Sequence, residues 1–351
     1  MTKNPLFSEE MIKLAEKQLA EQKKNLKDFL KCGVQNVPVT DEVLNKLVWI
    51  AGSDEHDVMC CHPGYDLNRN IESLQRTLET YRRCHTDLIK KLKDFDAASQ
   101  DATLFERPQV VELKKHEIGC RKEVFALSSA ASALVDIARH VTGKIDIPGF
   151  NEIRANIFDS NHHEFIKKLR NNLNHIKFLE PNWAIKNAGQ GQTSHFEFNT
   201  AKLLRDGDFN KEAREFIKKQ KNSIDVRTLF ETYYDSVDAF YAWLMPKIEN
   251  QLPTEVQDYR RCKKAMRANA ARCWYKILFT QIVKSETDLY SHLHKYLTPE
   301  ELKEINRLSH RSKEQIDRII EILDEDGACD DELRTLIYGA FNEDLGSNGL
   351  V

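Results

Sequence analysis

The segment from Leu169 to His175, LRNNLNH, holds residue types that together could cleave a phosphodiester bond. Arg170 offers a planar fork of N–H donors to phosphate oxygens, and His175 carries an imidazole whose ordinary pKa near 6.5 allows proton exchange at neutral pH. Because RNA supplies its own nucleophile, the 2′-hydroxyl, an enzyme needs only proton transfer and charge stabilisation at the phosphate. These residues predict cleavage without a metal or another cofactor, leaving 2′,3′-cyclic phosphate and 5′-hydroxyl ends.

Arg170, Asn171 and His175 also match the R-N-x-x-x-H motif of HEPN-domain ribonucleases, and the chain resembles that family over roughly residues 105 to 250. The stretches after the motif contribute to the resemblance: a loop, AKLL, EAREFIKKQ and IDVRTLFETYYDSVDAFYAWL. The resemblance implies a helical bundle that forms a homodimer, with two copies of the motif facing one cleft. It implies that Arg170 and His175 are catalytic and that Asn171 positions them. Similar domains act as toxins or abortive-infection effectors, so a role in defence against phage is implied as well.

The spacing of the motif leaves an alternative open. Residues five apart on a helix differ by about 140° around its axis, so Arg170 and His175 do not share one face of a helix. A site shared by two protomers relaxes this difficulty. Otherwise both residues are surface positions of an amphipathic helix, whose apolar side is Phe165, Ile166, Leu169, Leu173 and Ile176.

A second functional signal is a basic segment, Tyr259 to Ser285, which contains no acidic residue. A stripe of positive charge beside Tyr259, Trp274 and Tyr275 is suited to RNA phosphates, with bases stacking on the aromatic rings. The alternative is a solvated helix face. The residues predicted to bind RNA are Arg260, Lys263, Lys264, Arg267 and Arg272.

Two other clusters have residue types that bind metals but lack the necessary spacing. His56, Cys60, Cys61 and His62 have no second ligand pair at zinc-site spacing, which favours a plain loop. In DEDGACDDE, from Asp324 to Glu332, the glycine is fourth and not sixth, which disfavours an EF-hand calcium loop. No metal site is expected, and no phosphate-binding glycine loop is present in the sequence.

The clearest structural pattern is a heptad seam between residues 67 and 95, at alternating spacings of four and three. It predicts a long helix that packs in a coiled-coil hairpin or against a second copy of the chain. His85 is expected to be a hydrogen-bonded histidine at that interface. The seam comprises Leu67, Ile71, Leu74, Leu78, Tyr81, His85, Leu88, Leu92 and Phe95.

Further helices are predicted along the rest of the chain, from residues 8 to 31, after Thr40, after Pro108 and after Pro148. Small residues from 126 to 138 should let one helix approach its neighbour closely. Residues 182 to 199 predict a short hairpin or a surface loop. Two or three helices and a frayed tail are expected after Thr254. The sequence therefore predicts an all-α, multi-helix bundle in three parts: an N-terminal coiled-coil region (1–104), a HEPN-like domain (105–250) and a C-terminal helical region with the basic stripe (251–351).

The composition of the 351 residues is that of a globular protein, with 41% hydrophobic and 30% charged residues and a net charge of −3. No secretory signal or membrane span is expected, which predicts a cytoplasmic protein with reduced cysteines. The preferred hypothesis is a metal-independent endoribonuclease acting on RNA as a homodimer, whose regulator or antitoxin the sequence does not identify. The alternative is a non-catalytic helical protein that dimerises or holds a partner.

Overall fold

The computed structural model describes residues 13, 16–17, 20–21, 23–25, 58–174, 181–188, 191–283 and 288–341. The helix predicted after Thr40, the C-terminal tail, His56 and His175 lie outside the described residues, as does most of the helix predicted for 8–31. The chain divides into two compact units: a central unit, Leu67–Pro253, and a terminal unit made of Met1–Asp66 and Thr254–Val351. The predicted boundary at residue 104 therefore falls inside the central unit, whereas that at residue 250 lies close to the observed division.

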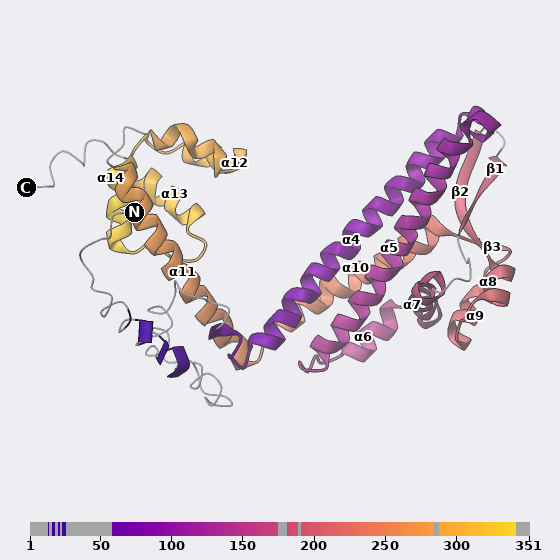
Figure 1. Ribbon diagram of the computed structural model, residues 1–351, viewed down its shortest axis with the longest axis horizontal. Helices are drawn as coiled ribbons and strands as arrows, with labels where there is room; N and C mark the ends of the chain where they lie inside the picture. The colour runs from indigo at the N-terminus through magenta and orange to yellow at the C-terminus, as the bar shows by residue number, and fades with distance from the viewer. Residues whose placement is uncertain are drawn as a thin grey trace, which may run out of the picture. The chain divides into compact units, whose positions relative to one another are not determined.

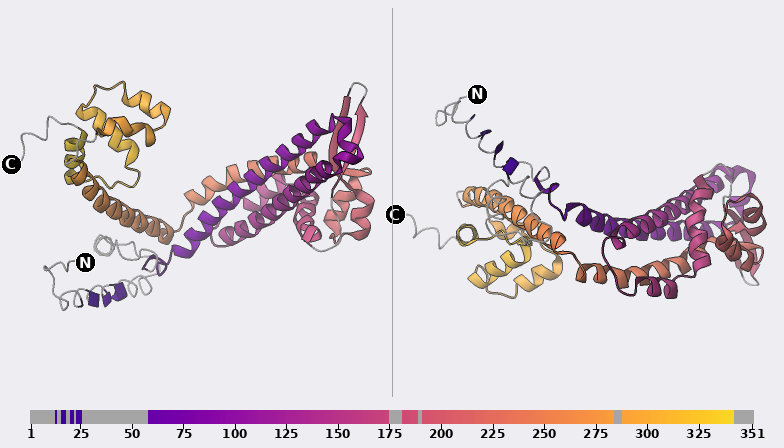
Figure 2. Two further views of the ribbon diagram at one scale, coloured as in Figure 1. Left: turned by 45° about the horizontal axis from the view of Figure 1, so that its top comes forward. Right: turned by 90° about the horizontal axis from the view of Figure 1, so that it is seen from below.

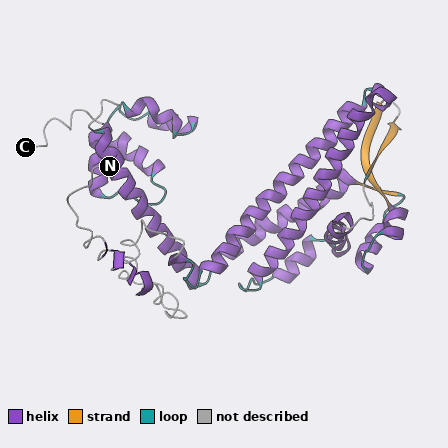
Figure 3. Cartoon of the chain, in the orientation of Figure 1, coloured by secondary structure: helices purple, strands orange, loops and turns teal. Residues whose placement is uncertain are grey.

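The central unit consists of long helices with a small antiparallel sheet (Figures 1 and 3). Its elements are α4 (Tyr65–Ser99), η1 (Ala102–Phe105), η2 (Arg107–Gln109), α5 (Val110–Thr142), α6 (Phe150–Ile157), α7 (Ser160–Asn174), β1 (Asn182–Ala188), β2 (Gly191–Asn199), α8 (Thr200–Asp206), α9 (Lys211–Lys219), β3 (Ser223–Asp225) and α10 (Val226–Asn250). Residues 182 to 199 thus form a hairpin, one of the two predicted alternatives. The sequence predicts that the helix which contains Val226 ends near Pro246 or Pro253. Helix α10 continues through Pro246 and ends at Asn250.

The heptad seam of α4 is covered within the chain itself. Its apolar positions from Ile71 to Phe95 are buried, and α4 and α5 run side by side in all three views (Figures 1 and 2). The thiol of Cys120 on α5 donates to the backbone carbonyl of Lys91 at 3.8 Å. On α10, the ring of Tyr234 stacks on His85 with the ring centroids 4.0 Å apart. The seam therefore forms an intramolecular helix bundle, the first of the two predicted possibilities.

His85 differs in part from its prediction. It lies at the predicted interface, but its Nε2 atom is buried without a hydrogen-bond partner, and stacking on Tyr234 takes the place of the expected hydrogen bond through that atom. Burial lowers the pKa of His85, which favours the neutral ring that stacks there.

The sheet closes one end of the α4–α5 pair. Strands β1, β2 and β3 lie in that order, and Phe198 of β2 faces Ile224 of β3 in the register. Phe196 packs edge-on against Phe95 of α4 at 4.9 Å between centroids. The Asp96 carboxylate accepts a hydrogen bond from the backbone N–H of Ser194 at 3.1 Å. These contacts hold the hairpin on the last turn of α4.

The terminal unit has its own apolar core. Its described elements are α11 (Thr254–Ile282), η3 (Leu289–Lys295), α12 (Pro299–Ile305), α13 (Lys313–Leu323) and α14 (Asp331–Phe341). Four α-helices occupy the region where two or three were predicted, because Thr298 and Ser312 act as N-caps that start separate helices. The buried cluster includes Leu293, Ile305, Ile316, Ile319, Leu333 and Ile337.

The helical content confirms the predicted all-α fold class and multi-helix architecture, with the three short strands as an addition. The segment Arg107–Thr142, which contains α5, is long and apolar enough to cross a membrane by length and composition, with a mean hydropathy of 1.3 in its best window. Half of that window is buried inside the protein, as in the core helix of a bundle.

A first prediction concerns Gly64, which packs against the start of α11. A Cβ atom at this position would lie 2.1 Å from the backbone oxygen of Glu255. Gly64→Ala should therefore destabilise the terminal unit by about 1–3 kcal/mol in chemical unfolding, since the backbone must shift.

The matched control is Gly119→Ala in the interior of α5, where the new Cβ meets only the Lys91 side chain at 3.7 Å. Alanine favours a helix over glycine, so the control should raise stability by about 0.5–1 kcal/mol. Equal effects of the two substitutions would contradict the close approach at Gly64.

Candidate functional site

Arg170 and Asn171 lie near the C-terminal end of α7, whereas His175 lies outside the described residues. The neighbouring Asn172 has the structural role there. Asn172 is buried; its side-chain oxygen accepts from the backbone N–H of Asp208 at 2.6 Å, and its amide donates to the Asp208 carbonyl at 3.2 Å. The same amide donates to the backbone carbonyl of Lys168 at 2.8 Å. Together with the buried Leu169, these bonds fix the rotation of α7 against the loop before α9.

This rotation determines where Arg170 and Asn171 are placed. Asn171 is exposed to solvent, whereas Arg170 is half-buried. The Nε atom of Arg170 is buried and has no hydrogen-bond partner. Among the described residues, Arg170 has no carboxylate partner in a salt bridge. Because a buried N–H donor without an acceptor costs about 1–3 kcal/mol, this guanidinium is poised for an acceptor from elsewhere.

A histidine pair at the other end of α7 forms a buried cluster that the sequence did not reveal. Nδ1 of His163 lies 2.9 Å from the hydroxyl of Tyr233, and the ring of His162 stacks on Phe216 at 4.8 Å between centroids. Burial lowers the pKa of both histidines to about 4. In the sequence, His162, His163 and Glu164 lack the HExxH spacing of a zinc-protease helix. The contact with Tyr233 is not visible there, because Tyr233 is 70 residues away from His163.

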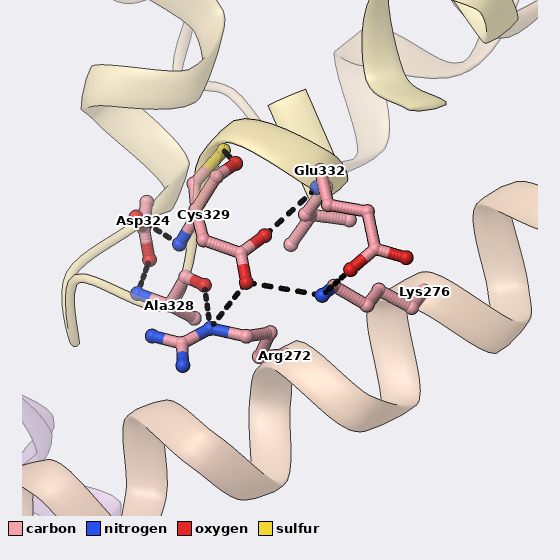
Figure 4. A network of polar contacts seen from close by, with 8 residues as sticks. Arg272, Lys276, Asp324, Ala328, Cys329 and Glu332 are labelled. Atoms are coloured by element: carbon pink, nitrogen blue, oxygen red, sulfur yellow. Dashed lines mark hydrogen bonds and ion pairs between the residues drawn. The ribbon is translucent and has the colours of Figure 1, made fainter. Parts of the chain in front are cut away.

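The basic stripe lies along α11 in the terminal unit, and part of it is neutralised. Nε of Arg272 donates to the backbone carbonyl of Ala328 at 2.8 Å and lies 3.3 Å from the Asp330 carboxylate. Lys276 pairs with Asp330 at 3.0 Å and also with Glu332 (Figure 4).

Arg267 is paired in the same way, with Asp326 at 3.5 Å. The acidic segment 324–332 therefore faces the basic helix, whose stretch from Tyr259 onwards contains no acidic residue of its own. Of the remaining predicted RNA-binding residues, Lys264 is exposed, and Arg260 and Lys263 are half-buried. The amino group of Lys263 lies 5.9 Å from the centre of the Tyr259 ring.

The cysteine–histidine cluster forms a turn against α11. Nδ1 of the buried His62 accepts a hydrogen bond from the backbone N–H of Gly64 at 3.1 Å. Its ring meets Tyr259 edge-on at 5.6 Å between centroids. Burial lowers the pKa of His62, against the opposing effect of Asp258. Within the described ranges, no group of three or more histidine, cysteine or acidic side chains could hold a metal ion.

Segment 324–332 is also organised by its own hydrogen bonds. The Asp324 carboxylate accepts from the backbone N–H groups of Ala328 at 2.6 Å and Cys329 at 2.9 Å (Figure 4). Asp330 accepts from the backbone N–H of Leu333 at 2.8 Å in the first turn of α14. Hydrogen bonds to backbone N–H groups thus occupy Asp324 and Asp330, and Asp330 also pairs with α11. These contacts give both carboxylates a structural role that does not involve calcium.

The chain matches no protein-family model, no curated protein and no solved structure. The resemblance to HEPN ribonucleases therefore rests on the sequence pattern alone.

The buried histidines predict an acid-sensitive fold. Because their pKa is near 4 in the folded chain and ordinarily near 6.5, the unfolded chain takes up protons first as the pH falls. The stabilisation by the neutral rings is complete above about pH 6.5 and is lost towards pH 4. In urea unfolding, His162→Phe, which can keep the stack on Phe216, should reduce the loss of stability between pH 7.5 and pH 5 by about 1–2 kcal/mol.

His140→Gln, at an exposed position of α5, is the matched control because it removes a histidine without altering the core. Its pH dependence should equal that of the wild type. An unchanged pH dependence in His162→Phe would contradict the assignment of the effect to this ring.

Proposed function

We propose that the chain is a metal-independent endoribonuclease of the HEPN type, acting in the cytoplasm as a homodimer. The observation that supports this proposal is the distribution of roles at the end of α7. Asn172 makes the hydrogen bonds that hold the helix. Asn171 is exposed to solvent, Arg170 is half-buried, and the Nε atom of Arg170 lacks an acceptor.

In this proposal, Arg170 binds the scissile phosphate and stabilises the charge that develops on its oxygens. Asn171 helps to position the phosphate, and His175 transfers the proton of the 2′-hydroxyl or of the leaving oxygen. The homodimer brings two motifs to one cleft, as the resemblance implies. A role as a toxin or anti-phage effector, with an unidentified regulator, is part of the same proposal. The exposed Lys264 would add a phosphate contact, and the other basic residues of α11 could contribute, but Arg267 and Arg272 would first have to leave their carboxylates.

The test is cleavage of total cellular RNA by the purified full-length chain in EDTA. Arg170→Ala and His175→Ala should each lower the cleavage rate by about 100-fold or more, since each removes a group that acts on the reacting phosphate. The wild-type products should carry 2′,3′-cyclic phosphate ends.

Arg205→Ala is the matched control, because Arg205 is an exposed arginine of the same unit that pairs only with its neighbour Asp206 among the described residues. It should cleave like the wild type. No cleavage by the wild type, or equal rates in all four proteins, would count against the proposal.

A second candidate function, a non-catalytic interaction protein, is favoured by an apolar groove in the terminal unit. The groove has a volume of about 260 Å³ and is lined mainly by apolar side chains of α11, η3, α13 and α14. Tyr296 at its edge is 71% exposed, and Ile277 on α11 is 60% exposed. Exposed apolar surface of this kind is typical of a contact with another protein.

In that candidate, the occupant of the groove is the second copy of the predicted homodimer. Leu278→Glu, in the groove, should weaken dimerisation at least tenfold in sedimentation equilibrium, because it places a charge in an apolar contact. Ile118→Glu makes the same change at an exposed position of α5 and serves as the comparison. Dissociation by Ile118→Glu alone would place the interface on the central unit and contradict this candidate.

A further inference from the structure

A small cavity in the central unit is lined by residues of α5, α6, α7 and α10. Its volume is about 70 Å³. Much of its wall is formed by three phenyl rings: Phe150 of α6, Phe158 just after α6, and Phe240 of α10. Phe158 packs edge-on against Phe240, with the ring centroids 5.4 Å apart. The remaining apolar lining comes from Ala131, Leu134, Val135, Ala138 and Val237.

The polar groups of the lining are one pair of side chains, the rim, and the hydroxyl of Tyr241, which donates to the backbone carbonyl of Leu134 at 3.3 Å. The pair is His163 and Tyr233, joined at 2.9 Å, in which His163 is half-buried and Tyr233 is only 2% exposed. At the rim are two exposed guanidinium groups, Arg139 and Arg154.

Both rim arginines are weakly engaged. Arg139 is 3.7 Å from Asp136, and both side chains are more than 60% exposed, so this surface ion pair contributes little. Arg154 lies over the ring of Phe150 at 5.8 Å. Burial is the main cause that lowers the pKa of His163, followed by the charge of Lys167, with Glu164 opposing and with small contributions from Arg154 and Arg139. Apolar walls, a cationic rim and a few convergent polar groups are the usual features of a small-molecule site.

Helix α6 covers the cavity and is suited to open. None of its residues is buried, although Phe150 and Arg154 line the space below. It begins after Gly149, which has a left-handed φ of 78°. An element with so little buried surface opens at a lower free-energy cost than α5 or α10.

We propose that this cavity binds a small organic carboxylate, with a short branched apolar group between the phenyl rings and the carboxylate against Arg139 and Arg154. The size limit follows from the volume, because an interior cavity that holds benzene measures about 150 Å³. The rim charges select an anion, and the apolar walls disfavour inorganic phosphate, whose whole surface is polar. The site is separate from the last turn of α7 and does not depend on the proposed ribonuclease activity.

The experiment is a titration of the full-length protein with isobutyrate, observed through the ¹³C methyl signals of Val135 and Val237. Both signals should shift saturably, and isobutyramide, the neutral analogue, should bind about two- to fivefold more weakly because it lacks the charge that the exposed arginines would pair with. Acetate should bind more weakly through loss of apolar contact, and benzoate more weakly through its size. The double variant Arg139→Gln/Arg154→Gln should lose the preference for isobutyrate over isobutyramide, whereas Arg205→Gln should keep it.

Three outcomes would overturn the proposal. The methyl signals could remain unchanged at saturating isobutyrate, which would mean that water alone fills the cavity. Isobutyrate and isobutyramide could bind equally in the wild type, which would make the rim arginines irrelevant. Inorganic phosphate could shift the same methyl signals as strongly as isobutyrate, which would mean that the rim binds any anion.

Discussion

The apolar face of α4 has to be removed from water along almost its whole length, and three other elements share this task in order along the helix. Tyr234 of α10 stacks on His85, α5 packs near Lys91, and the β hairpin covers Phe95 through Phe196. Each fully buried large side chain contributes about 1.5–3 kcal/mol relative to exposure. The burial of this one seam therefore sets the arrangement of the central unit, because α5, α10 and the sheet all pack against it.

The position of α7 follows from that arrangement. Helices α5 and α7 are in contact, small residues of α5 such as Ala130 and Ala131 are buried, and Phe165, Ile166 and Leu169 form the buried side of α7. Two hydrogen bonds between Asn172 and Asp208 then fix the rotation of its last turn. This rotation leaves Asn171 in solvent and places Arg170 partly in the protein without an acceptor for its Nε atom. The packing of the helix, and not the motif itself, thus decides how the proposed ribonuclease residues are presented.

Electrostatic pairing has a comparable influence in the terminal unit. Arg272 and Lys276 would be free cations if α11 stood alone, but Asp330 lies within 3.3 Å and 3.0 Å of them. The acidic segment is held in place by its own hydrogen bonds through Asp324 and by the helix start at α14. Surface pairs of this kind contribute little to stability, but they reduce the positive potential available to a polyanion. The proposed binding of RNA phosphates to α11 would therefore compete with these carboxylates.

The sequence by itself determined the helical class, the seam of α4, the close approach along α5 and the existence of a break near residues 182 to 199, because these follow from local periodicity and from small or turn-forming residues. It also identified Arg170, Asn171 and His175 as a possible site from their types and spacing. Only the tertiary structure decided that the seam is covered within one chain, that Asp330 faces Arg272, and that His163 meets Tyr233. Each of these contacts joins side chains from distant parts of the chain, and the energy of burying or pairing them depends on three-dimensional packing that a linear pattern does not contain.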